Sequence, residues 1–159
     1  MEPKAIQELY PEKFSHCYGC GTRNSAGLGI RSYWRGEECV CSFTPRPEHM
    51  AFPGFVYGGL IASVIDCHST GTAAAAAYRH EGREPGSDPP LRFVTGSLHV
   101  DFLKPTPLGP PLELRSRAKE IGARKVVVET DLFVNGVLCA RGTLVAVKIP
   151  EQMGGEPRG

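Results

Sequence analysis

The run from Phe52 to Ala77, FPGFVYGGLIASVIDCHSTGTAAAAA, constrains the fold of this chain more than any other stretch. A Pro-Gly turn and the pair Gly58-Gly59 open it, and small and apolar residues follow with Asp66 in their middle. Small side chains let a helix approach other backbone closely, so the run predicts a central helix wrapped by other elements. An ionisable group in so apolar a run costs free energy unless it is paired or used. Asp66 is therefore the first candidate functional residue.

A helical wheel separates this run into two faces. One face is a polar seam with i, i+4, i+7, i+11 spacing. Its members are Gly59, Ser63, Asp66 and Thr70. The other face is apolar and suited to packing on a sheet. Its members are Leu60, Val64, Cys67, Gly71 and Ala74.

The start of the predicted helix is a second candidate site. Its free amide N–H groups and positive dipole end can bind a carbonyl oxygen or an anion. However, Gly58 and Asp66 are eight residues apart, which is roughly 12 Å along a helix axis. One small reacting group cannot touch both. If both act on one substrate atom, they come from two copies of the helix that run antiparallel across a dimer.

Composition indicates an ordinary globular protein. With 159 residues, 41% of them apolar and 22% charged, the chain is expected to form a single domain over residues 1–159. Its core covers about residues 16–149, and residues 150–159 are expected to be a disordered tail. A net charge of +1 gives no support for nucleic acid or for a membrane surface. The first residues lack the apolar core of a signal peptide, so a cytoplasmic protein with reduced thiols is expected.

The six cysteines raise the question of a metal. Cys17 and Cys20 form a C-x-x-C pair that can begin a zinc site, with Cys39 and Cys41, or His16, completing it. A second C-x-x-C is missing from the sequence, and Cys39 and Cys41 occupy ordinary strand positions. The alternative is a tight turn with two half-buried thiols. The sequence favours this alternative, and no metal or cofactor is expected.

The remaining elements are mostly strands. A short helix over residues 3–10 and a turn-rich loop come first, and a polar loop over 79–90 follows the central helix. Alternating apolar residues predict strands at 28–34, 38–43, 91–103, 112–121, 125–134 and 137–149. Asn135-Gly136 between two of them is a strong hairpin signal. The order indicates an α+β fold in which one antiparallel sheet curls around the helix.

The run PGFVYGGLIASVID resembles hotdog-fold acyl-CoA thioesterases of the branch that contains phenylacetyl-CoA thioesterases and the "thioesterase superfamily member" proteins. The motif of that branch is His-Gly-Gly, seven residues, then Asp. Gly58, Gly59 and Asp66 keep its spacing, and Tyr57 replaces the histidine. The stretch VTGSLHVDFLKPTPLG resembles the next strand of the family, where Thr95 precedes Pro105 by ten residues. The opening C-x-x-C-G-x-x-N-x-x-G-L also occurs in bacterial relatives. The resemblance covers roughly residues 16–148.

The resemblance implies a homodimer, or a homotetramer built from it, with active sites at the interface. The Gly58 amide would polarise the thioester carbonyl. Asp66 of the other subunit would act as general base on a water or as nucleophile, with Thr95 orienting the water or the carboxylate. Partial desolvation should raise the pKa of Asp66.

Other residues are candidates for substrate contact. Tyr57, Gly59 and Ser63 lie near the expected site, and Tyr57 can also line the acyl pocket. Arg124 and Lys125 stand where relatives have a basic pair that would bind CoA phosphates. His49 precedes a Phe-Pro-Gly sequence similar to that of hotdog dehydratases, with shifted spacing.

These residues leave three functions open. The first is an acyl-CoA thioesterase, and the second is a non-catalytic protein that binds acyl-CoA or lipid. The third is a dehydratase or hydratase, which needs His49 to act near Asp66. The thioesterase agrees best with the motif.

Overall fold

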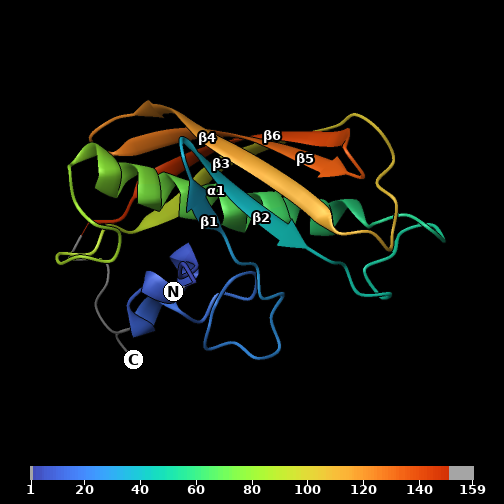
Figure 1. The fold of residues 1–159 in the computed structure, drawn as a ribbon, viewed down its shortest axis with the longest axis horizontal. Coiled ribbons are helices and arrows are strands. Elements are labelled where there is room, and N and C mark those ends of the chain that lie inside the picture. The colour runs from blue at the N-terminus through green and yellow to red at the C-terminus, as the bar shows by residue number, and fades with distance from the viewer. Residues whose placement is uncertain (1, 151–159) are drawn as a thin grey trace.

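The computed structural model describes residues 2–150, which form six strands and one long helix (Figure 1). The helix α1 spans Gly58–His80, and two short 3-10 helices, η1 (Ile6–Leu9) and η2 (Glu12–Phe14), precede the sheet. The strands are β1 (Tyr33–Arg35), β2 (Glu38–Phe43), β3 (Phe93–Phe102), β4 (Leu112–Ile121), β5 (Lys125–Val134) and β6 (Val137–Lys148).

The strands form one antiparallel sheet in the order β1-β2-β4-β5-β6-β3. The Asn135-Gly136 turn joins β5 to β6 with φ angles of 49° and 78°, as expected for a hairpin turn that needs positive φ at both positions. Ten-residue β3 and three-residue β1 are the two edges. One sheet and one central helix confirm the predicted α+β hotdog layout.

The helix packs closely on the sheet because its partners are small. A Cβ placed on Gly142 of β6 would lie 2.6 Å from Ile65 Cγ2, so glycine is needed for this approach. The predicted apolar face is buried at Leu60, Val64 and Ala74, whereas the polar seam is half-buried. The helix therefore keeps one polar side along the sheet edge.

The N-terminal segment covers the helix on the side away from the sheet (Figure 1). Residues 71–78 are buried on every side as a result, including Gly71, whose missing Cβ leaves room for Gln7 Nε2. The Gln7 side chain also accepts a hydrogen bond from the Ser32 amide at 2.8 Å, and the Ser32 hydroxyl lies 2.8 Å from His68 Nδ1. This buried polar chain fixes the N-terminal segment to the helix.

Several element boundaries differ from the sequence prediction. The short helix expected over residues 3 to 10 is only the four-residue 3-10 helix η1. The first strand begins at Tyr33 rather than at residue 28, because residues 28–32 hydrogen-bond to loops. For example, the Ile6 amide donates to the Ser32 carbonyl at 2.8 Å. The helix continues to His80, so the exposed loop starts later than expected. The predicted tail lies outside the described residues beyond Pro150. None of the helices in residues 2–150 is long and apolar enough to cross a membrane.

Candidate active site

The Asp66 carboxylate lies between α1 and the edge strand β3. The Thr95 hydroxyl donates a hydrogen bond to Asp66 Oδ1. Thr70, one turn further along the helix, donates to the Asp66 carbonyl at 2.8 Å, and its hydroxyl oxygen lies 3.4 Å from that of Thr95. Among residues 2–150, Thr95 supplies the side-chain hydrogen bond to this carboxylate. The second carboxylate oxygen, Oδ2, is therefore available to a ligand.

A β-bulge directs Thr95 toward the helix. The pairing of β3 with β6 shifts register between Thr95 and Ser97, so Gly96 is the extra residue. In a regular strand, Thr95 and Leu98 would point to opposite faces because they are three residues apart. The bulge places both of them on the side of the sheet that faces α1. A Cβ on Gly96 would lie 2.7 Å from Val147 Cγ2, so glycine suits this position. Bulges often redirect a side chain next to an active site.

Burial sets the electrostatics of Asp66. Partial desolvation raises the pKa of the Asp66 carboxyl above its usual range, and the Thr95 hydrogen bond opposes that shift. The nearby Cys17 sulfur raises the Asp66 pKa further. The Cys17 sulfur also lies 3.8 Å from that of Cys67, the residue after Asp66, so the N-terminal loop reaches this part of the helix, which the sequence did not predict.

The first turn of α1 offers backbone donors. The helix begins at Gly58, and the Leu60 and Ile61 amides donate to the Tyr57 carbonyl at 3.1 and 3.2 Å. The first amides of a helix have no acceptor within it. In the part of the chain that the structure describes, the Gly58 and Gly59 amides are therefore open to a ligand.

Tyr57 packs over this first turn. A Cβ on Gly59 would lie 2.5 Å from the Tyr57 ring, so the ring covers the Gly59 backbone. A Cβ on Gly58 would instead make ordinary 3.5 Å contact with Phe102. The ring is exposed and lies beside the open amides.

Two other predicted site residues are engaged within the chain. The Ser63 hydroxyl donates to the Gly59 carbonyl at 2.8 Å. His49 Nδ1 accepts from the Arg46 amide at 2.9 Å, and the ring stacks on Phe43 with centroids 6.2 Å apart. The His49 carbonyl accepts from the Tyr57 amide at 2.9 Å. These contacts hold the segment that leads into α1.

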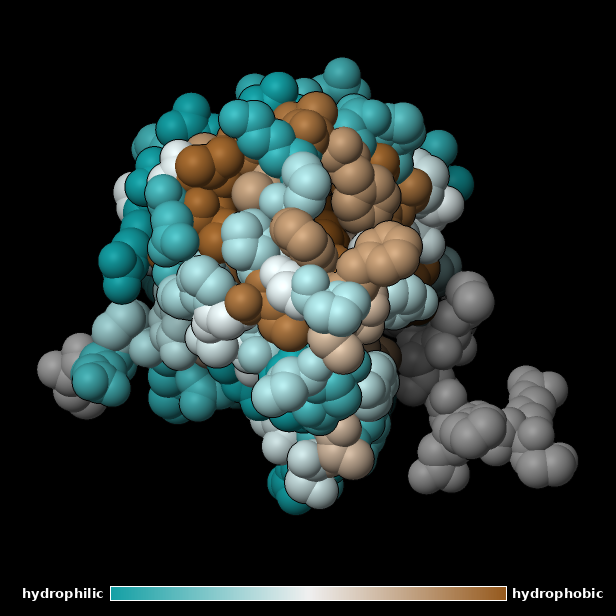
Figure 2. Space-filling model, turned by 90° about the vertical axis from the view of Figure 1, so that its right-hand side faces the viewer, coloured by the Kyte–Doolittle hydropathy of each residue, from teal (hydrophilic) through white to brown (hydrophobic). Residues whose placement is uncertain are grey.

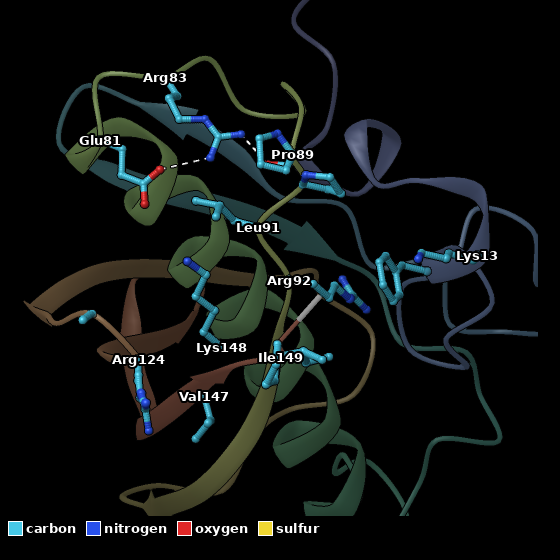
Figure 3. Close-up of a pocket in the computed structure, with 14 residues that line it drawn as sticks. Lys13, Glu81, Arg83, Pro89, Leu91, Arg92, Arg124, Val147, Lys148 and Ile149 are labelled. Carbon is cyan, nitrogen blue, oxygen red and sulfur yellow. Dashed lines mark hydrogen bonds and ion pairs between the residues drawn. The ribbon is translucent and has the colours of Figure 1, made fainter. Parts of the chain in front are cut away.

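A basic groove of about 970 Å³ lies at the other end of the helix (Figure 3). Its cations come from separate segments of the chain. They are Lys13, Arg83, Arg92, Arg124 and Lys148. Glu81 pairs with Arg83 at 3.0 Å, and Arg92 lies over the rings of Tyr10 and Phe14.

The groove contains one of the two predicted phosphate-binding residues. Arg124 from the β4–β5 turn lines it, whereas Lys125 is not among the lining residues. The groove also reaches Val147, which pairs with Val94, the neighbour of Thr95. Sequence reasoning missed the other cations because only the fold brings their segments together.

Apolar side chains gather on the end of the molecule where α1 begins (Figure 2). The large exposed apolar residues from the segments around this end are Met50, Phe52, Phe55, Phe102 and Leu103. Apolar patches on a surface often mark a partner or ligand site. The apolar surface lies at the same end of the molecule as the Gly58 and Gly59 amides.

Comparison with known families assigns this architecture. Residues 53–140 match the model of the thioesterase superfamily, which covers the start of the helix, Asp66 and Thr95. The chain belongs to the thioesterase superfamily.

Individual relatives agree with this family. A crystal structure of a thioesterase superfamily protein from Shewanella loihica PV-4 is 50% identical, with a TM-score of 0.66, and the match covers 89% of this chain and 100% of that one. Acyl-coenzyme A thioesterase THEM4 of Xenopus laevis is 39% identical over 87 residues, which are 55% of this chain and 33% of that protein. The chain thus matches about a third of that relative's length. A Streptococcus mutans UA159 structure bound to acetyl-CoA shares the fold at 16% identity and a TM-score of 0.62, over 76% and 88% of the two chains.

The bulge at Gly96 yields a stability prediction. Gly96→Ala places a Cβ against Val147, so we expect a loss of about 1–3 kcal/mol in the free energy of unfolding. In a Val147→Ala background the obstructing methyl group is gone, so part of that loss should disappear, while the 3.2 Å approach to the Val145 carbonyl oxygen remains. Urea unfolding of the four chains of this double-mutant cycle measures the coupling. Equal costs in both backgrounds would contradict the contact.

Proposed function

We propose that this chain hydrolyses the thioester of an acyl-CoA, releasing a free acid and CoA. The observation that carries the proposal is a half-buried carboxylate in an apolar helix, held by a hydroxyl of the neighbouring strand. Such a carboxylate costs free energy to bury and is suited to general-base chemistry. Membership of the thioesterase superfamily and the similarity to an acyl-coenzyme A thioesterase support this choice.

The active site would be shared between two copies of the chain. The helix is continuous from Gly58 to His80, so the Gly58 amide and Asp66 are roughly 12 Å apart along one axis. A second copy would bring its own helix start toward Asp66. The exposed edge strand β3 supports this arrangement, since a long unpaired edge favours pairing with another strand. Val94, Phe102 and Leu103 add exposed apolar surface in and beside that strand.

In this arrangement each residue has one task. The Gly58 amide of one copy donates to the thioester carbonyl oxygen, and Asp66 of the other copy takes a proton from a water molecule. The water oxygen bonds to the carbonyl carbon, and the Gly58 amide stabilises the resulting oxyanion. The C–S bond then breaks, and the CoA sulfur leaves with the proton that Asp66 returns. Thr95 keeps the carboxylate aimed at the water.

The basic groove would bind the phosphates of CoA. Clustered cations suit phosphate oxygens, and arginine can bind them in a bidentate way. Arg124 and Lys148 bring positive charge to the groove without an acidic partner among the ion pairs of residues 2–150.

We also infer that the protein works in the cytoplasm, because all six cysteines are free in this structure and a reducing compartment keeps them so.

The first test is thiol release from short, medium, long-chain and aromatic acyl-CoAs. Asp66→Asn keeps the shape of the side chain but removes the base, so kcat should fall by about 10²–10⁴. Asp131→Asn is the matched control, because Asp131 pairs with Arg141 on the sheet and lies outside the proposed site. Undiminished release by folded Asp66→Asn protein would contradict the enzyme. Acyl-CoA binding without release by the wild type would favour the non-catalytic binding protein.

The Gly58 amide can be removed without breaking the helix. Proline is well tolerated at the first helical position, and Tyr57 already has the extended backbone (φ −62°, ψ 132°) that a following proline requires. Gly58→Pro should therefore fold and lose about 10²–10³ in kcat. Gly58→Ala retains the amide and should lose far less.

Mixing the two inactive chains tests the shared site. A mixed dimer of Gly58→Pro and Asp66→Asn has one intact pair, so subunit exchange should restore about a quarter of the wild-type activity. The measurement is thiol release after co-refolding, with each variant refolded alone as the control. If both variants form folded dimers and the mixture stays inactive, the two groups do not act across the interface.

The groove yields a prediction about substrate affinity. Arg124→Ala should raise KM for acyl-CoA several-fold with kcat nearly unchanged, because it removes binding that is equal in ground and transition states. The effect should shrink at high salt, which screens exposed charges. Arg115→Ala, an exposed cation on β4 outside the groove, is the control. An unchanged KM for Arg124→Ala would place the CoA phosphates elsewhere.

A further inference from the structure

Three cysteine sulfurs gather beside the Asp66 carboxylate. The Sγ atoms of Cys17, Cys20 and Cys67 all lie within 4.8 Å of one another. Cys67 follows Asp66 in α1, whereas the other two come from the N-terminal loop. The sequence suggested Cys39, Cys41 or His16 as completing ligands, but Cys67 is the residue that joins the pair. Cys39 and Cys41 are buried in β2 instead.

The loop is shaped to bring these sulfurs together. The Gly21 amide donates to the Cys17 carbonyl at 2.7 Å and closes a tight turn around the pair. A Cβ on Gly19 would lie 2.3 Å from Cys67 Sγ, so only glycine allows the loop backbone this close to the helix. The Gly19 carbonyl accepts from the Ile30 amide at 3.0 Å, which anchors the turn.

The spacing of the sulfurs matches a metal centre. Two thiolates bound at 2.3 Å to a tetrahedral Zn²⁺ lie about 3.8 Å apart. The Cys17 and Cys67 sulfurs are separated by 3.8 Å. We propose that Cys17, Cys20 and Cys67 form a three-thiolate site for a thiophilic cation, with Zn²⁺ as the expected occupant.

The donor set determines the kind of metal. Thiolates favour Zn²⁺ or Cu⁺ over Mg²⁺ or Ca²⁺, which prefer oxygen ligands. Binding releases the thiol protons to solvent and involves no change in oxidation state. Cys17 is exposed, so a water molecule completes the fourth position from the solvent side.

The consequence of a bound ion is local stiffness. It ties the N-terminal loop to the middle of α1 next to Asp66, and it adds its binding free energy to folding. This inference does not depend on the proposed hydrolase activity. Its test therefore uses metal content, absorption and melting temperature.

The experiment uses the full chain, purified under reducing conditions without chelator. Elemental mass spectrometry should find about one zinc per chain, as expected for one set of three thiolate ligands in each chain. Replacing zinc by Co²⁺ should produce thiolate-to-cobalt charge-transfer absorption, and a strong chelator should lower the melting temperature. Copper found in place of zinc would support the three-thiolate site and would identify Cu⁺, rather than Zn²⁺, as its natural ion.

Matched variants identify the ligands. Cys17→Ser alters an exposed side chain, so this variant should fold. Both Cys17→Ser and Cys67→Ser should lose the metal and the cobalt absorption. Cys139→Ser removes a buried thiol outside the cluster and should keep both signals. Two results would overturn the proposal. One is reduced wild-type protein that binds neither Zn²⁺ nor Co²⁺, and the other is metal retained by folded Cys17→Ser and Cys67→Ser alike. A Cys17–Cys67 disulfide in metal-free protein would identify the pair as a redox couple instead.

Discussion

The close approach of α1 to the sheet is the constraint on which the rest of the structure depends. Gly142 leaves room for Ile65, and this contact sets the height of the helix above the strands. Asp66, the next residue, then reaches the Thr95 hydroxyl across the gap. A larger residue on β6 would lift the helix and separate the two groups. Packing density in the core thus decides the geometry of a polar contact at its edge.

The same helix serves three chemically different regions. Its first turn presents backbone amides, its middle carries Asp66 and Cys67, and its C-terminal end reaches the basic groove near Glu81. A single rigid element therefore fixes the relative positions of the backbone donors, the Asp66 carboxylate and the Cys67 sulfur. Because small residues dominate the helix, loops and strands can approach it from several sides.

Local signals were sufficient for much of the fold. The strands at 112–121 and 125–134 and the Asn135-Gly136 turn have the predicted bounds, because alternation and turn chemistry act over a few residues. Asp66 stood out by its polarity, and its neighbour Thr95 was found through a family resemblance. The bulge at Gly96, the place of Cys67 beside the loop and the cations of the groove were not predicted. Each depends on segments that only tertiary packing brings together.

The unequal edges of the sheet limit how this protein can assemble. β1 offers three residues for pairing, whereas β3 offers ten. Pairing of β3 with the same strand of a second copy would use the long edge of both chains at once. The remaining short edges are poor templates for further growth. Association through β3 would therefore be self-terminating, and it would produce a closed symmetric pair rather than an open fibre.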